Sequence, residues 1–262
     1  MVLGTVVSMI YNLTDTFFIA QTQNTNLVAG ITLCTPLFSM MIALGDIFGL
    51  GGSSVISRLL GQKKFALAGR INSFCFYGAC LLGVVVTILL FAFKNQALSL
   101  LGANASTYRY AIIYYEIMAA SSVLIITSLV PINTLRTEGL AKQSMIGSAS
   151  GTILKIFLDP LFIFGFHLGA AGAALATMVG YIVTDLILIG YTVKRARYLQ
   201  VHFHQKKIPA VEIRDVLMIG LPASVTNLMT MLGTALMNNF LIDYGADKVA
   251  GFGIAIKVET IV

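Results

Sequence analysis

Two aspartates inside long apolar runs are the residues of this sequence best suited to chemistry. Asp15 lies near the end of a run over residues 1–20, and Asp159 lies in a later run. Ionisable groups within a membrane span are costly and are candidates for function. Both runs lead outward in the topology that the loop charges indicate, so we expect both carboxylates about 8 to 12 Å below the outer surface, at about 1.5 Å per residue. Two acids at one depth could bind a proton or cation; alternatively, each only hydrogen-bonds a neighbouring helix.

Three side chains could tune these acids. Tyr11 and Asn12 precede Asp15 by four and three residues, which puts them on its helix face and gives it a hydrogen-bonding shell. Lys155 precedes Asp159 by four residues and lies too deep to reach the membrane surface. A buried lysine must pair or lose its proton. We therefore expect Lys155 to pair with Asp159 or with Asp15.

Pro160 and Asp185 complete the candidate site. Pro160 removes a backbone donor and frees a carbonyl about one turn earlier, so it would place a bend beside Asp159. Protonating a carboxylate at such a hinge could change helix packing, although a static kink is also common in membrane spans. Asp185 lies midway along another run, where we expect it to support the site or to pair with a cation.

No residue pattern suggests covalent chemistry or a bound cofactor. The three histidines lie in loops, and the three cysteines, Cys34, Cys75 and Cys80, lie in apolar runs without metal-ligand spacing. The glycine-rich segments 49–54 and 169–177 lack the Lys-Ser/Thr ending of a phosphate-binding loop, and small residues at this spacing let membrane helices approach closely. We predict that the protein is not an enzyme and needs no cofactor or structural metal.

Composition and loop charge indicate an all-α, polytopic membrane protein. Hydrophobic residues make up 57% of the chain and charged residues 11%, against about 25% in soluble domains. The net charge of +6 reflects topology and contact with anionic lipid, not binding of nucleic acid. Every second connection between apolar runs is basic, which keeps it in the cytoplasm. These connections carry Arg58, Lys63, Lys64, Arg70, Arg136, Lys142, Lys194, Arg195, Arg197, Lys206, Lys207 and Arg214.

The apolar runs predict eight helices with a cytoplasmic amino terminus. They cover about residues 1–20, 27–50, 71–93, 108–135, 145–166, 170–193 and 216–242, and the last begins near residue 249. We predict an amino-terminal six-helix bundle over 1–194, a cytoplasmic linker over 195–214, and the first helix and a half of a second bundle over 215–262. The abrupt first and last runs suggest a fragment of a longer polypeptide.

An internal repeat supports a second, related bundle. The sequence FFIAQTQNTNLVAGI at 17–31 and the sequence NNFLIDYGADKVAGFGI at 238–254 both show an aromatic-aliphatic helix end, a polar turn and a hydrophobic-Ala-Gly opening. Six predicted helices separate the two copies. Repeated halves are a feature of transporter folds.

The chain resembles the multidrug and toxic compound extrusion (MATE) family of secondary transporters. The resemblance rests on motifs that follow the family's order and cover nearly the whole chain. These are YNLTDTFFIA at 11–20, SSVISRLLGQ at 53–62, NTLRTEGLAKQSM at 133–145, LDPLFIFG at 158–165, GAAGAALAT at 169–177 and IGLPASVTN at 219–227.

The resemblance implies a function. Two six-helix bundles would flank a cleft, and alternating access would export organic cations or drugs in antiport with protons or sodium ions. The coupling acids would be Asp15, with a sodium ion there if sodium drives export, and Asp159. One branch of the family adds acids in its seventh and eighth helices, whereas the seventh run here has no interior acid. The resemblance is therefore closer to the branch typified by the DNA-damage-inducible F protein. The expected location is the plasma (inner) membrane, and the expected state is a monomer once full length, in contact with lipid.

One departure and two alternatives stay open. The family usually has asparagine one turn before the fifth-span acid, where this chain has Lys155, so coupling would shift toward Asp15. A flippase for a lipid-linked oligosaccharide, in the same superfamily, should line its cleft with several basic residues. An intramembrane aspartyl protease could use Asp46, but Ala43 replaces the first glycine of its Gly-x-Gly-Asp pattern and no Tyr-Asp partner appears.

Overall fold

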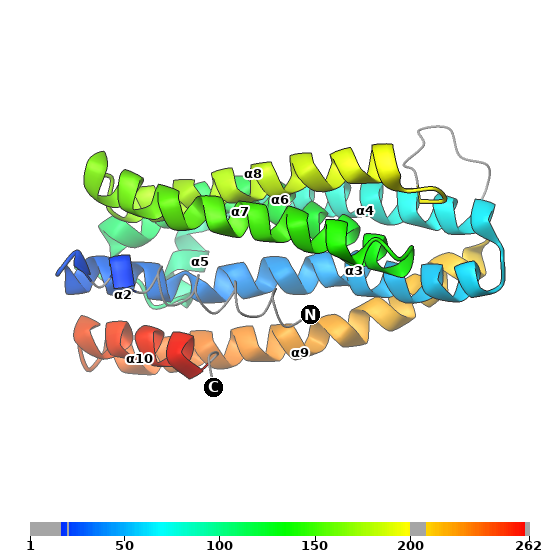
Figure 1. Ribbon diagram of the computed structural model, residues 1–262. Helices are drawn as coiled ribbons and strands as arrows, with labels where there is room; N and C mark the ends of the chain where they lie inside the picture. Colours follow the sequence, from blue (N-terminus) through cyan, green and yellow to red (C-terminus); the bar gives the residue numbers. More distant parts are fainter. Residues whose placement is uncertain (1–16, 20, 200–207, 260–262) are drawn as a thin grey trace.

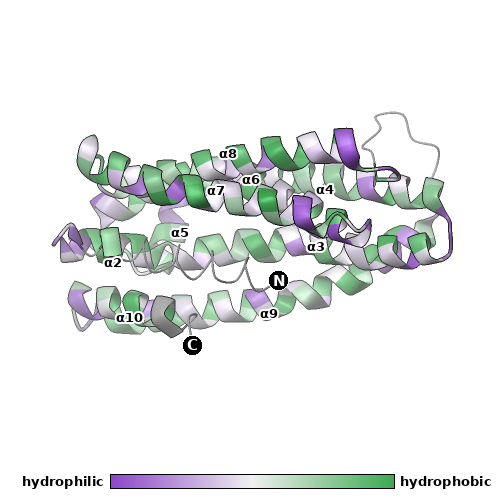
Figure 2. Cartoon of the chain, viewed as in Figure 1, coloured by the Kyte–Doolittle hydropathy of each residue, from purple (hydrophilic) through white to green (hydrophobic). Residues whose placement is uncertain are grey.

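The protein is a long bundle of helices, seen from the side in Figure 1. The computed structural model describes residues 17–19, 21–199 and 208–259, and within these ranges no strand occurs. Six helical segments of this part are long and apolar enough to cross a membrane. Hydrophilic residues are most frequent at the turns at the two ends of the bundle (Figure 2). The prediction of an all-α membrane protein is confirmed.

The helices follow the predicted spans closely. Their bounds are α2 Thr25–Leu33, α3 Thr35–Gly61, α4 Phe65–Ala92, α5 Lys94–Leu100, α6 Tyr108–Thr137, α7 Ala141–Pro160, the π-helix η1 Leu161–Gly165, α8 Ala170–Arg195, α9 Ala210–Ile242 and α10 Ala246–Glu259. The first predicted span falls almost wholly outside the described residues.

Two local features go beyond the predicted spans. The second span is divided into α2 and α3 at Cys34, and Pro36 opens α3, where a missing N–H costs no helical hydrogen bond. The connection after α4 contains the short helix α5, whose Lys94 pairs with Glu116 of α6 at 2.8 Å. Neither feature was predicted from the apolar runs.

Helix α3 is central and packs against α4, α6 and α9. Its residues Met41 and Ile56 are fully buried, as is Tyr115 of α6, whose hydroxyl donates to the Leu90 carbonyl at 2.9 Å. The outer faces of α4 and α9 are apolar and exposed, for example at Leu81 and Met229. Exposed apolar faces of this extent are expected where lipid or further membrane helices replace water.

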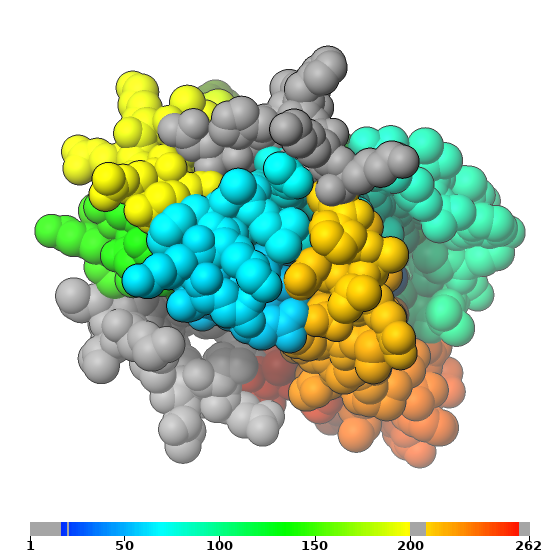
Figure 3. All heavy atoms as spheres, turned by 90° about the vertical axis from the view of Figure 1, so that its right-hand side faces the viewer, coloured from blue at the N-terminus to red at the C-terminus, as the bar shows by residue number. Residues whose placement is uncertain are grey.

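The basic connections gather at one end of the bundle, called the basic end here. This end holds the α3–α4 and α6–α7 turns, the end of α8 and the start of α9 (Figure 1, right). Figure 3 looks onto it, with the α3–α4 turn near the centre. The connections that are basic in sequence thus lie together at one end of the bundle. Which side of a membrane that face meets remains a prediction.

Hydrogen bonds and ring stacking hold residues 197–199, which follow α8, against the basic end. Glu138 accepts hydrogen bonds from the backbone N–H groups of Arg197 at 2.5 Å and Tyr198 at 2.6 Å. Asn72 donates to the Leu199 carbonyl at 2.7 Å, and the ring of Tyr198 stacks on Phe65 with 4.2 Å between centroids. Helix α9 begins at Ala210, so the end of the predicted linker is helical.

Candidate functional site

A buried ion pair lies on α7. The Lys155 ammonium is 3.3 Å from the Asp159 carboxylate, and the two side chains are 7% and 0% exposed. Their spacing of four residues places both on one helix face. The predicted pairing of Lys155 with Asp159 is therefore confirmed.

Pro160 follows the acid and changes the helix. Helix α7 ends at Pro160, and the π-helix η1 continues over Leu161–Gly165, where the N–H of Phe166 donates to the carbonyl of Leu161 at 2.9 Å. Proline cannot donate to the preceding turn, so the helix widens here. π-Helical turns are frequent at functional sites. The widening starts at Leu161, two residues after Asp159.

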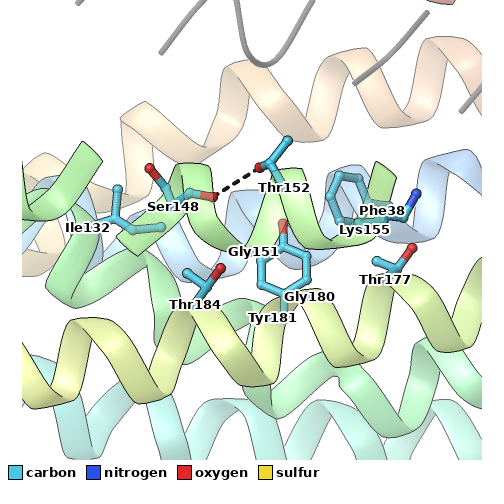
Figure 4. A pocket seen from close by; sticks show the side chains of 10 residues that line it. All are labelled: Phe38, Ile132, Ser148, Gly151, Thr152, Lys155, Thr177, Gly180, Tyr181 and Thr184. Carbon is cyan, nitrogen blue, oxygen red and sulfur yellow. Dashed lines mark hydrogen bonds between the residues drawn. The ribbon is translucent and has the colours of Figure 1, made fainter. Parts of the chain in front are cut away.

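A cavity of about 130 Å³ lies between α7 and α8 (Figure 4). Lys155 lies toward one end of it and Ser148 toward the other, with Thr152 between them. Its lining residues are Phe38, Ile132, Ser148, Gly151, Thr152, Lys155, Thr177, Gly180, Tyr181 and Thr184. The Thr152 hydroxyl donates to the Ser148 carbonyl at 3.0 Å and the Thr177 hydroxyl to Ala173 at 2.9 Å. Their hydroxyl oxygens retain acceptor capacity for a bound proton donor or cation.

Close packing of α7 against α8 shapes this cavity. A Cβ atom added to Gly151 would lie 2.0 Å from the Thr184 hydroxyl oxygen and 2.4 Å from the Gly180 carbonyl oxygen. Glycine lets membrane helices approach this closely. The close approach brings the polar residues of the two helices to one cavity.

The other predicted site residues have different outcomes. Tyr11, Asn12 and Asp15 lie outside the described residues. Asp185 is 7% exposed on α8, and its Oδ1 has no hydrogen-bond partner among the described residues. It follows Thr184, which lines the cavity, but Asp185 is not among the lining residues. Its predicted supporting role remains a prediction.

Sequence reasoning missed the hydroxyl residues of the cavity. Ser148, Thr152 and Lys155 have i, i+4, i+7 spacing on α7. The same spacing relates Thr177, Tyr181 and Thr184 on α8. Because this spacing places residues on one helix face, the sequence could have predicted a polar face on each of these two apolar spans.

The sequence and fold match known transporters. The MatE family model matches residues 1–161. This chain belongs to the MATE family. It is 31% identical over 258 residues to the multidrug export protein MepA of Staphylococcus aureus (strain NCTC 8325 / PS 47), and the match covers 98% of this chain and 57% of MepA. Members of this family are transporters and not enzymes.

Two solved structures share the fold. An inward-facing multidrug resistance MATE transporter of the MOP superfamily superimposes with a TM-score of 0.90 at 28% identity, covering 96% of this chain and 57% of that one. The MATE multidrug transporter DinF-BH, solved as a complex with a ligand, gives 0.90 at 30% identity, covering 97% and 57%. The chain thus spans little more than half the length of these relatives.

Proposed function

We propose that the full-length protein exports organic cations from the cell by alternating access, in antiport with protons or sodium ions. Membership of the MATE family, and the printed description of MepA as a multidrug export protein, support this proposal. The observation that carries it is the fully buried carboxylate of Asp159, which pairs with Lys155, a residue that lines the hydroxyl-rich cavity. A buried acid of this kind in a membrane span marks an ion or proton pathway in transporters.

Asp15 and Asp159 are the proposed coupling acids. The ring of Phe18, three residues after Asp15, lies 6.2 Å from the ring of Phe164, five residues after Asp159. This contact supports the proposal that the two acids lie near one another at similar depth. Tyr11 and Asn12 would hydrogen-bond Asp15, and a sodium ion would bind there if sodium drives export.

The ion pair favours Asp15 as the principal coupling group. Lys155 already supplies a positive charge to Asp159 at 3.3 Å. A second cation there would meet the repulsion of the ammonium, and a proton on Asp159 would leave that ammonium without its partner. Asp159 would therefore respond to ions less readily than Asp15.

We further propose the location and organisation predicted from sequence. The basic end would face the cytoplasm of a plasma (inner) membrane, with a cytoplasmic amino terminus and surrounding lipid, because positive residues flanking a span resist translocation. Residues 1–194 would form the first bundle, 195–214 the linker and 215–262 the start of the second. The full-length protein would act as a monomer.

Lys155 also favours one alternative, a lipid-linked oligosaccharide flippase. It brings a basic group into the bundle interior, where an anionic substrate would need one. Several basic residues would be expected for a pyrophosphate-linked lipid. Among the residues that line the described cavity, Lys155 is the one basic side chain.

Export from loaded vesicles separates the two functions. The full-length protein would be reconstituted, and efflux of ethidium and norfloxacin measured with a proton gradient, a sodium gradient or neither. Gradient-dependent efflux of these compounds supports the proposal. Absence of efflux, together with gradient-independent translocation of a fluorescent pyrophosphate-linked lipid, would establish the flippase instead.

A further inference from the structure

A second buried carboxylate lies between α3 and α9. The side-chain amide of Asn227 donates to Asp46 Oδ2 at 3.0 Å. Asp46 is 8% exposed and lies in the middle part of α3, away from the cavity between α7 and α8. This bond joins residues on two helices that belong to different predicted bundles.

The contact between α3 and α9 is close on the basic-end side of Asp46. A Cβ atom added to Gly51 would lie 2.3 Å from the Val216 carbonyl oxygen, and one added to Gly220 would lie 2.1 Å from the Ile47 carbonyl oxygen. Such contact excludes water from the neighbourhood of Asp46. The acid is therefore held against an amide in a packed seam.

Polar contacts of α9 lie beyond Asp46 in both directions along the helix axis. At the basic end Arg58 forms ion pairs with Glu212, at 3.3 Å, and with Asp215. Beyond the opposite end of α3, the amide of Asn238 on α9 donates to the carbonyl of Thr32 on α2 at 3.3 Å. Helix α9 is thus held by polar contacts on both sides of the buried Asp46.

No charged side chain in the described part of the chain forms an ion pair with Asp46. The charged residues of the helices packed against α3 are Arg70 on α4, Arg109, Glu116 and Arg136 on α6, and Glu212, Arg214 and Asp215 on α9; Arg58 lies on α3 itself. They lie toward the helix ends, whereas Asp46 bonds an uncharged amide. An ionised carboxylate buried beside a neutral amide is unfavourable, because one hydrogen bond does not replace hydration.

We propose that Asp46 is a proton-binding site that controls contact between the two bundles. Neutral Asp46 keeps the bond, because its carbonyl oxygen accepts from Asn227 without a buried charge. Ionised Asp46 is stabilised by water, which reaches it only when α3 and α9 separate. Proton binding closes the seam and proton release opens it, because a proton that binds one state better shifts the population toward that state.

This inference rests on the proposed function, since it gives alternating access a proton-dependent step. The step is separate from Asp15 and Asp159. It can be observed as a distance in the absence of any transported compound.

The test is a spin-label distance in the full-length protein. The labels replace Ala66 at the start of α4 and Ala210 at the start of α9, both exposed, after substitution of the native cysteines. Distances are measured in nanodiscs from about pH 5.5 to about pH 8.5. This range lies above the ordinary pKa of an aspartate carboxyl group. We expect one short distance at low pH and a growing longer population as the pH rises. Asp46→Asn, which cannot ionise, should stay short throughout.

Two further variants make the outcome decisive. Asn227→Ala should lose short-distance population at low pH, because neutral Asp46 then lacks its donor. Glu116→Gln, an acid-to-amide change at the Lys94 ion pair, should titrate like the wild type. A wild type without pH-dependent distances, or an Asp46→Asn variant that titrates like the wild type, overturns the inference. Failed drug efflux with an intact distance titration would refute the proposed function alone.

Discussion

Lys155 and Asp159 form an ion pair one helical turn apart, with 3.3 Å between ammonium nitrogen and carboxylate oxygen and almost no exposure of either side chain. Taking two charges out of water costs free energy that their attraction only partly offsets. Each partner nevertheless depends on the other, because a lone buried charge is worse than a pair. The pair therefore controls both the stability of the bundle and the charge offered to any ion entering it.

Removing only the lysine should destabilise the protein. We expect Lys155→Met to lower the free energy of unfolding by about 3 to 5 kcal/mol, since Asp159 then lacks its partner. Adding Asp159→Asn should restore most of the loss. Thermal unfolding in detergent measures both effects. Lys142→Met, an exposed lysine on the same helix, should stay within about 0.5 kcal/mol of the wild type.

Lys155→Asn should be tolerated and should strengthen ion coupling through Asp159, because an uncharged amide can share a cation with the acid. Sodium- or proton-driven efflux measures this change. Equal stability and equal efflux for Lys155→Met and the double variant would show that the pair is not energetically coupled.

Asp15→Asn should abolish coupled export while leaving the protein in the membrane. The amide has nearly the size of the acid but can neither release a proton nor balance a cation. Dye efflux and membrane content measure the two properties. Asp243→Asn, at the exposed turn after α9, is the matched control and should keep export. Efflux near the wild-type rate by Asp15→Asn would remove Asp15 from the mechanism.

Labelling of single cysteines should fix the orientation. Because basic loops stay in the cytoplasm, positions Gln23 and Asn104 should react with an impermeant thiol reagent outside intact cells. Positions Lys64, Lys142 and Gln205 should react only after the membrane is opened. Reaction of position 205 from outside would reverse the orientation.

Hydropathy was sufficient to predict the spans that the structure describes, because it depends on residues adjacent in sequence. The Lys155–Asp159 pair was predictable for the same reason, since four residues along a helix always share a face. The hydrogen bond between Asp46 and Asn227 was not predictable from the sequence. It joins positions 181 residues apart and depends on how α3 packs against α9.

Local backbone irregularities were only partly predictable. Pro160 predicted a disturbance next to Asp159, but not that the helix would continue as a π-turn over Leu161–Gly165. The division between α2 and α3 at Cys34 depends on packing too, since the Cys34 thiol lies 3.6 Å from the Ala111 carbonyl of α6. A proline signals that one hydrogen bond is lost, whereas the surrounding helices decide how the chain compensates.

Pro160→Ala tests whether the π-turn serves transport. Alanine restores a backbone donor, so we expect the helix to continue regularly and the stability to be kept or raised. Export should slow, because the bend next to Asp159 would be lost. Thermal unfolding and efflux rate measure the two effects. Unchanged efflux would identify Pro160 as a static kink.

The α3–α9 seam can be tested with two glycines of the same helix. Gly220→Ala adds a Cβ atom 2.1 Å from the Ile47 carbonyl oxygen, so α9 must move away from α3. We expect a loss of about 1 to 3 kcal/mol, as in other overpacked interiors. Gly233→Ala meets nothing within 4 Å and should gain about 0.5 to 1 kcal/mol from helix propensity alone. Thermal unfolding of both variants measures the difference. If both variants shift stability equally, α3 and α9 do not pack this closely in the membrane, and Asp46 would not be enclosed by the seam.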